Sequence, residues 1–404
     1  MQVLKTLMER SYQSHPAFNF KTPSWEVPDE TLLTFSRAYS LARTVGSRLD
    51  RKSFSAVRAD CQQGLLGVFS SLQEQCSDEF EERFLTELRN ECVRLLDEEL
   101  TWYAKQTRAR FVDLDKPAGR LDAVGLQTDR HYFGQLSQDA VDEIRALAAK
   151  HLDGFRANAV AGRLTREDLS VNAGGNVRAI RDVLNREFKS LGVLDAVSAC
   201  TGRKTRVTGL ALELSVPLAS WWKNAIEGLD RPPKTLYAHL DEGIAFPKSI
   251  VYLSDVAEQN GPTSCFPGAY EAMLLTPLQE LIGRIVGNVG NNPASPLNAY
   301  YGKQYHQSIN SENFRRHFMR LPESLRFNSH MGWDIFPGCE LEAQLVALEK
   351  KMIGPAGTFI VFDGARLLHR GGLMEQGERV ALQVIFSDLT FTERVVSKMK
   401  RILS

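Results

Sequence analysis

Residues 206–216, Arg-Val-Thr-Gly-Leu-Ala-Leu-Glu-Leu-Ser-Val, decide the fold class of this chain. Successive side chains of a strand point to opposite faces. Leu210, Leu212 and Leu214 therefore share one face, and the small or polar residues between them share the other. Pro217 ends the run, because proline has no backbone N–H for a strand ladder. The stretch predicts a strand with one buried face.

Similar patterns recur along the chain and indicate several short strands. We expect strands at 234–241, 250–253, 263–266, 358–362 and 379–387. Turn signals such as Gly261-Pro262 and Pro267-Gly268 separate some of them. Because helices do not alternate with these strands, the pattern favours an antiparallel sandwich or jelly roll over a parallel α/β sheet.

The first 125 residues have a different pattern, which is typical of amphipathic helices. Apolar residues recur at intervals of three and four in 29–42, 57–72 and 80–102, and Asp78 with Glu81 offers a capping box before the third helix. This region contains no metal, phosphate or nucleophile motif. A structural or docking role is therefore expected, either as a cap on a neighbouring domain or as a homodimer contact.

Further helices are expected after residue 126. Ser137 is a good N-cap, and apolar residues follow it at helical spacing up to Ala148. Two more helices are expected at about 177–191 and 275–286.

Charge balance, the absence of long apolar runs and the cysteine pattern argue against nucleic-acid-binding, membrane and disulfide-rich secreted proteins. Among 404 residues, Lys+Arg and Asp+Glu are both 49, so the formal net charge is zero and neither a nucleic acid nor an anionic membrane is the expected partner. No long apolar run predicts a membrane span or a signal peptide. The six cysteines form no C-x-x-C pair, which predicts reduced thiols. We therefore expect a cytoplasmic protein.

His239-Leu240-Asp241 lies inside the strand expected at 234–241. On a strand, the imidazole and the carboxylate of this pair would point to the same face. With one more histidine they would complete the 2-His-1-carboxylate set that holds Fe(II) in non-haem oxygenases. The pair alone is a weak signal, because a surface turn can also carry His-x-Asp.

A histidine and an arginine further along the chain strengthen the metal hypothesis. His369 stands near the entry of the strand expected after 358–362, and Arg379 opens the last strand. Two imidazoles and a carboxylate leave three positions of an octahedral Fe(II) open, so a 2-oxo acid can take two and O2 the third. A guanidinium can grip the far carboxylate of that acid as a bidentate fork.

Residues from about 126 to 390 resemble the phytanoyl-CoA dioxygenase (PhyH) family of Fe(II)/2-oxoglutarate-dependent oxygenases. The resemblance rests on four segments: Tyr132-Phe133 to Leu147, His239-Leu240-Asp241, Tyr252 to Gly268 with its Asn260-Gly261-Pro262 motif, and His369 with Arg379. It implies that His239, Asp241 and His369 bind the metal, and that Arg379 binds the 2-oxoglutarate co-substrate. Thr263 and Tyr252 are further candidates for co-substrate contacts, although strand packing is the more ordinary explanation for both.

The sequence departs from the family pattern in several places. Ala269-Tyr270 stands where relatives often have Ser-His, and Gly371 stands where a serine is common. The long interval between Asp241 and His369 predicts an insertion at about 270–355. Its Tyr300 and Tyr301 could line a substrate lid or form a small core of the insertion. Other histidines of this region, His306, His317 and His330, lack a matched carboxylate and are not expected to bind metal.

The resemblance and the strand pattern together predict an α+β fold. We expect a helical N-terminal region at 1–125 and a double-stranded β-helix oxygenase domain, of jelly-roll or cupin type, at 126–404. The expected activity is that of a dioxygenase that uses Fe(II), 2-oxoglutarate and O2 to hydroxylate a C–H bond of a specific small molecule, free or carrier-bound, with succinate and CO2 as co-products.

The residue at position 241 also bears on the type of reaction. Asp241 favours hydroxylation over halogenation, because related halogenases have a small residue at that position. Two alternatives stay open: a cupin-like metalloenzyme that does not use 2-oxoglutarate, and a catalytically silent binding or scaffold protein.

Overall fold

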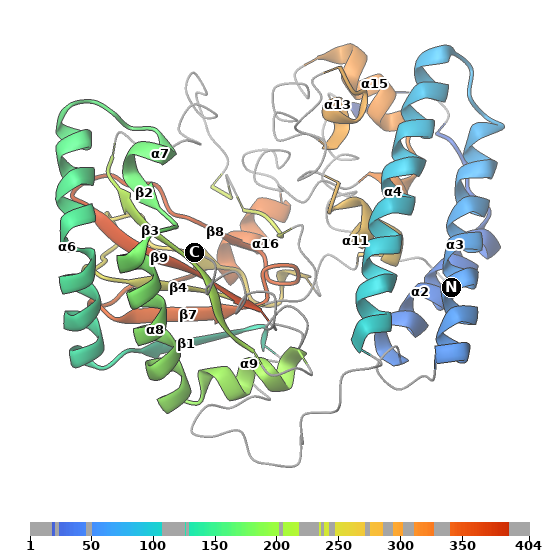
Figure 1. Ribbon diagram of the computed structural model, residues 1–404. Coiled ribbons are helices and arrows are strands. Elements are labelled where there is room, and N and C mark those ends of the chain that lie inside the picture. Colours follow the sequence, from blue (N-terminus) through green and yellow to red (C-terminus); the bar gives the residue numbers. More distant parts are fainter. Residues whose placement is uncertain are drawn as a thin grey trace. The chain divides into compact units, whose positions relative to one another are not determined.

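The computed structural model describes residues 18–20, 24–45, 51–106, 126, 129–201, 205–217, 234–235, 238–241, 247–270, 275–285, 294–301, 311–326 and 340–387. These residues belong to two compact units, one built on β-sheets and one on helices (Figure 1). Among the helices within these ranges, none combines the length and the hydrophobicity that a membrane span requires.

A six-stranded antiparallel sheet forms the centre of the first unit, in the order β1-β7-β4-β9-β3-β2. Its strands are β1 (His131–Gln135), β2 (Ser170–Val171), β3 (Arg206–Ser215), β4 (Lys248–Tyr252), β7 (Thr358–Phe362) and β9 (Arg379–Ser387). The alternating pattern at 206–216 forms β3, which pairs along its length with β9. The strands expected at 358–362 and 379–387 are confirmed with the same bounds.

Helices cover one face of this sheet (Figure 1). They are α6 (Gln138–Val160), α7 (Arg166–Leu169), α8 (Gly175–Ser190) and α9 (Val193–Thr201). Alternate residues of β3 and β9, such as Leu212 and Leu382, pack in one hydrophobic cluster with Ile144 and Leu184 of the helices. The expected N-cap of α6 is confirmed, because the Ser137 side chain accepts a hydrogen bond from the Ala140 N–H.

A three-stranded antiparallel sheet, in the order β6-β5-β8, packs on the other side of the six-stranded sheet. Its strands are β5 (Ser264–Cys265), β6 (Lys350–Lys351) and β8 (His369–Arg370). A second hydrophobic cluster joins Tyr252 and Ala381 of the large sheet to Cys265 of the small one. The first unit is therefore two antiparallel sheets packed face to face around a common interior.

The second unit is helical and includes the N-terminal helices α2 (Asp29–Val45), α3 (Arg51–Gln73) and α4 (Glu79–Gln106), which confirm the periodic patterns. Its later elements are α11 (Pro277–Ile282), α13 (Leu297–Tyr301), α15 (Glu312–Arg320), the 3₁₀ turn η3 (Glu323–Leu325) and α16 (Glu340–Leu348). Residues of the expected insertion thus pack with the N-terminal helices. Tyr300 and Tyr301 are buried against Phe84 of α4, so they belong to a core rather than to an exposed lid.

A buried polar network ties the early and late helices of this unit together. Glu99 of α4 is fully buried and forms an ion pair with Arg284, which follows α11. The Tyr39 hydroxyl donates to Glu99 at 2.6 Å, and the Tyr103 hydroxyl donates to it at 2.8 Å. Each polar group of this network therefore has a partner, as burial of charge requires.

Two expected elements differ from the structure. The strand expected at 234–241 is not regular: Lys234 and Thr235 form a turn, His239 makes a single β-bridge, and residues 236–237 lie outside the described residues. The Thr235 carbonyl accepts the Ala238 N–H at 2.9 Å, so the backbone makes a local turn bond in place of a ladder bond. The helix expected at 275–286 is confirmed only as α11, which begins after the N-cap Thr276.

Candidate active site

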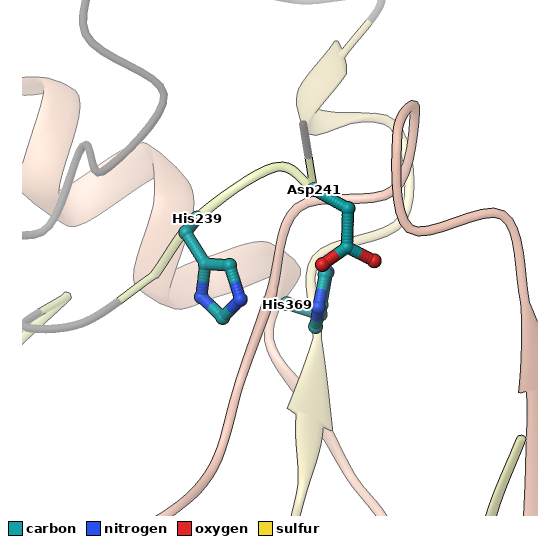
Figure 2. A group of neighbouring side chains, drawn as sticks. All are labelled: His239, Asp241 and His369. Carbon is teal, nitrogen blue, oxygen red and sulfur yellow. The ribbon is translucent and has the colours of Figure 1, made fainter. Parts of the chain in front are cut away.

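Three of the residues singled out in the sequence lie together. His239, Asp241 and His369 each offer one ligand atom, and these atoms all lie within 4.8 Å of one another. Figure 2 shows the two imidazole rings and the carboxylate gathered around one region, with His239 and Asp241 carried by the same segment. His239 and Asp241 are half-buried, whereas His369 is buried. Side chains from distant parts of the sequence therefore form one potential metal site.

His369 is fixed by its place in β8. Its backbone pairs with Cys265 of β5, and its ring packs on Phe362 with the ring centroids 4.7 Å apart. The ring Nδ1 lies 2.8 Å from the Leu367 carbonyl oxygen. A carbonyl can only accept, so Nδ1 carries the proton and the lone pair is on Nε2. Such a bond orients a metal-binding histidine and fixes its tautomer.

The donor set of the three side chains fits Fe(II). Two neutral imidazoles and one carboxylate are the ligands of the facial triad, which leaves coordination positions open for further ligands. The set contains no thiolate, and the five cysteines that the structure describes are thiols rather than disulfides. A closed structural zinc site of the Cys-rich kind is therefore not indicated by these residues.

Arg379 begins β9 on the face of the sheet that looks toward the interior, since Val380 belongs to the cluster under the helices and Ala381 to the cluster between the sheets. Its guanidinium donates to the Gly261 carbonyl and, at 3.2 Å, to the Ser215 hydroxyl. Its Nε is buried and has no hydrogen-bond partner. None of the ion pairs found among the described residues includes Arg379.

The electrostatics of Arg379 follow from this environment. Burial lowers the pKa of the Arg379 guanidinium, and the opposing influence of Tyr252 and Glu213 is too small to restore it. Arginine nevertheless remains protonated in proteins at neutral pH. The interior of the sheet unit thus contains a cation with an unused N–H and no paired carboxylate among the described residues, which is the arrangement that an anionic ligand would complete.

Gly261 shows why the Asn260-Gly261-Pro262 motif suits this place. Its φ is 62°, and a Cβ atom at this position would lie 2.6 Å from the Gly372 carbonyl oxygen. Only glycine tolerates both the left-handed backbone and this close approach. The turn packs on the segment just after His369, and the Gly261 carbonyl meets Arg379. The motif therefore links the arginine to the strand that carries the histidine.

Tyr252 and Thr263 lie next to each other in the interior. Tyr252 is fully buried, and its hydroxyl oxygen accepts the Thr263 N–H at 2.7 Å. Burial raises the pKa of Tyr252, although the nearby charge of Arg379 acts in the opposite direction. The hydroxyl therefore keeps its proton at neutral pH. Tyr252 packs in the cluster between the sheets, and Thr263 is buried just before β5. Contacts of Tyr252 and Thr263 with a bound co-substrate stay predictions.

Two of the other residues considered in the sequence are described by the structure and lie elsewhere. His317 lies on α15 with its ring against Phe80, and Tyr270 makes a hydrogen bond to Glu280 in the helical unit. His306 and His330 lie outside the described residues.

Sequence reasoning missed three groups around the predicted residues: the Ser215 hydroxyl and the carbonyl groups of Gly261 and Leu367. The role of a backbone carbonyl cannot be predicted from residue types, because every residue has such a group. Ser215 shows only the ordinary alternation of a strand, so its contact with Arg379 had no signal of its own.

The sequence has no match among family models, and no curated protein matches it. Solved structures similar to this chain include AviO1 from Streptomyces viridochromogenes Tue57, at 13% identity and a TM-score of 0.34, over 69% of this chain and 96% of that chain. EctD from S. alaskensis with 2-oxoglutarate and 5-hydroxyectoine matches at 14% identity and a TM-score of 0.36, over 69% and 79% of the two chains. HygX from Streptomyces hygroscopicus with nickel and 2-oxoglutarate bound matches at 13% identity and a TM-score of 0.35, over 68% and 88%.

Proposed function

We propose that this protein is an Fe(II)/2-oxoglutarate-dependent dioxygenase that hydroxylates a C–H bond of a specific small molecule. The observation that carries the proposal is the gathering of His239, Asp241 and His369 within 4.8 Å in a chain that also holds an interior arginine without a carboxylate partner among the described residues. The fold that fits this activity is a double-stranded β-helix, and the two facing antiparallel sheets support it.

The side chains of His239, Asp241 and His369 would bind Fe(II) on one face of its coordination octahedron. His369 enters with its Nδ1 proton engaged by the Leu367 carbonyl, so Nε2 is the atom available to the metal. Iron(II) with bound 2-oxoglutarate and O2 supplies the oxidation of an unactivated C–H bond, with succinate and CO2 as co-products. The apolar ring of Phe362 lies against His369 and keeps water from that side of the ligand.

Arg379 would bind the far carboxylate of 2-oxoglutarate. Its contacts with Ser215 and the Gly261 carbonyl hold the guanidinium in place, and its buried Nε–H is available as a donor. The Tyr252 hydroxyl accepts from the Thr263 N–H, so its own proton can point to the same carboxylate. Tyr252 then acts directly on the co-substrate, and Thr263 acts by orienting Tyr252.

The test is an anaerobic addition of Fe(II) and 2-oxoglutarate to the metal-free protein. We expect a visible metal-to-ligand charge-transfer band that Asp241→Ala and Arg379→Ala remove at moderate co-substrate concentration. Arg366→Ala is the matched control, because Arg366 is a partly exposed arginine of the same unit as Arg379 that already lies 3.9 Å from Asp363. It should leave the band unchanged.

The outcomes separate the alternatives. Iron binding without a 2-oxoglutarate-dependent band would indicate a cupin-like metalloenzyme instead. If the protein neither binds iron nor shows the charge-transfer band, the oxygenase proposal is wrong and a binding or scaffold protein is favoured. Succinate formation coupled to candidate small molecules, free or attached to a carrier, then identifies the substrate.

A further inference from the structure

Glu342 of α16 is a carboxylate that the iron site does not use directly. It is only 6% exposed, and its Oε1 accepts the backbone N–H of Lys234 at 2.5 Å. A buried carboxylate is unfavourable unless it is hydrogen-bonded, and bonds to a charged acceptor are stronger than neutral ones. The bond therefore fixes the backbone at Lys234 to the helix.

Lys234 lies close in the sequence to His239 and Asp241, the proposed metal ligands. Lys234 and Thr235 form a turn, Thr235 is fully buried, and its carbonyl accepts the Ala238 N–H at 2.9 Å. The next residue is His239, whose single bridge is the only ladder pairing in the described part of this segment. The contact from α16 therefore supplies a fixed point at the start of the segment that leads to His239 and Asp241.

We propose that Glu342 is a positioning residue for His239 and Asp241, acting through the backbone of Lys234. The inference rests on the proposed function, because it takes those two residues as iron ligands. Groups that orient metal ligands from outside the coordination shell commonly change metal affinity by about 10- to 100-fold when they are removed. Helix α16 of the expected insertion would thereby control the geometry of the first two ligands in the sequence.

Glu340 separates this role from a general effect on the helix. Both glutamates lie in the first turn of α16, where a negative charge favours the helix dipole. Glu340 is exposed, and the Gln344 side chain donates to it at 2.8 Å. Only Glu342 of the two is buried and bonded to the Lys234 N–H. Glu340→Ala is therefore the matched control.

The experiment measures Fe(II) affinity and amide hydrogen exchange on the full chain, well below its melting temperature. Glu342→Ala should weaken Fe(II) binding by about tenfold or more. It should also speed exchange of the amides of residues 238–241 in the metal-free protein. Glu342→Gln keeps an acceptor oxygen and should stay within about threefold of the wild type. Glu340→Ala should change neither measurement.

Two results would overturn the inference. One is an unchanged Fe(II) affinity and exchange rate in Glu342→Ala, even if its melting temperature falls, because that result describes packing alone. The other is an equal loss in Glu340→Ala. Failure of the proposed function gives a different result: the wild type would not bind Fe(II), while the exchange measurement would still decide whether Glu342 holds the segment.

Discussion

Arg284 in the helical unit and Arg379 in the sheet unit are both arginines placed in an interior, and their surroundings differ. Burial opposes the charge of Arg284, but Tyr39 and Glu99 outweigh it and raise its pKa overall. Burial also opposes the charge of Arg379, and there it prevails, so the pKa is lowered. Arg284 has the Glu99 carboxylate as a partner, whereas the contacts of Arg379 are a carbonyl and a hydroxyl.

The difference between the two environments indicates a different role for each arginine. A cation whose charge is balanced within its own unit serves the folded structure. A cation whose charge is not balanced by a described carboxylate destabilises the unliganded state, and an incoming anion can recover that free energy on binding. We therefore expect Arg284 to contribute to stability, and the surroundings of Arg379 support the proposal that it binds an anion.

The largest expected effect comes from breaking the Arg284 pair. Glu99→Ala leaves the Arg284 charge buried without its carboxylate and removes the acceptor of the Tyr39 and Tyr103 hydroxyls. We expect a loss of about 3–5 kcal/mol in the free energy of unfolding. Urea denaturation followed by circular dichroism measures it. Arg94→Ala, which breaks a surface pair with Glu91, should change stability by less than about 1 kcal/mol.

Arg379→Met tests whether the charge of Arg379 destabilises the protein when no anion is bound. It removes a poorly compensated charge and keeps much of the side-chain volume, so the metal-free protein should lose less than about 1 kcal/mol or gain stability. In the same variant, 2-oxoglutarate should no longer raise the melting temperature in the presence of Fe(II). Thermal melts with and without the co-substrate provide both values. A loss above about 2 kcal/mol would contradict the comparison, because it would mean that Ser215 and Gly261 already stabilise the charge.

The smallest expected effect is a dependence of stability on acid pH. Burial alone would raise the pKa of Glu99, but Arg284 and the two tyrosine hydroxyls lower it overall. The stability that this carboxylate contributes is therefore complete above the ordinary glutamate pKa of about 4.3 and is lost as pH falls through the lower folded value. Unfolding curves at neutral pH and below about pH 4 should show this loss, and Glu99→Gln should reduce the difference between them.

The sequence predicted the elements whose signals are local. The structure confirms the strands predicted from alternation at 206–216 and 379–387 and the helices predicted before residue 106. These predictions succeed because the buried face of a strand or helix is set by residues two to four positions apart in the sequence. The prediction of a regular strand at 234–241 was wrong, since a turn bond from Ala238 to Thr235 competes with a ladder. The gathering of His239, Asp241 and His369 was expected from the motif and is found in the structure.

Contacts between distant parts of the chain were beyond sequence reasoning. Nothing in the residues near Glu99 indicates that Arg284 is its partner, because either could have formed an exposed pair. The bond from Lys234 to Glu342 is hidden for the same reason, and a backbone group takes part in it. The insertion was expected as an addition to the sheet domain, whereas its described helices α11 and α13 pack with the N-terminal helices.

The order of the strands has a consequence for synthesis of the protein. β9, the last described strand in the sequence, lies between β4 and β3 in the middle of the large sheet. During synthesis, β3 and β4 are made before β9, the strand that pairs with both of them. Until β9 is made, the edges of β3 and β4 that will pair with it are exposed and can pair with other chains, which leads to aggregation. Such distant pairing slows folding. We therefore expect a nascent chain that stops before residue 379 to depend on chaperones, because its large sheet would lack the central strand.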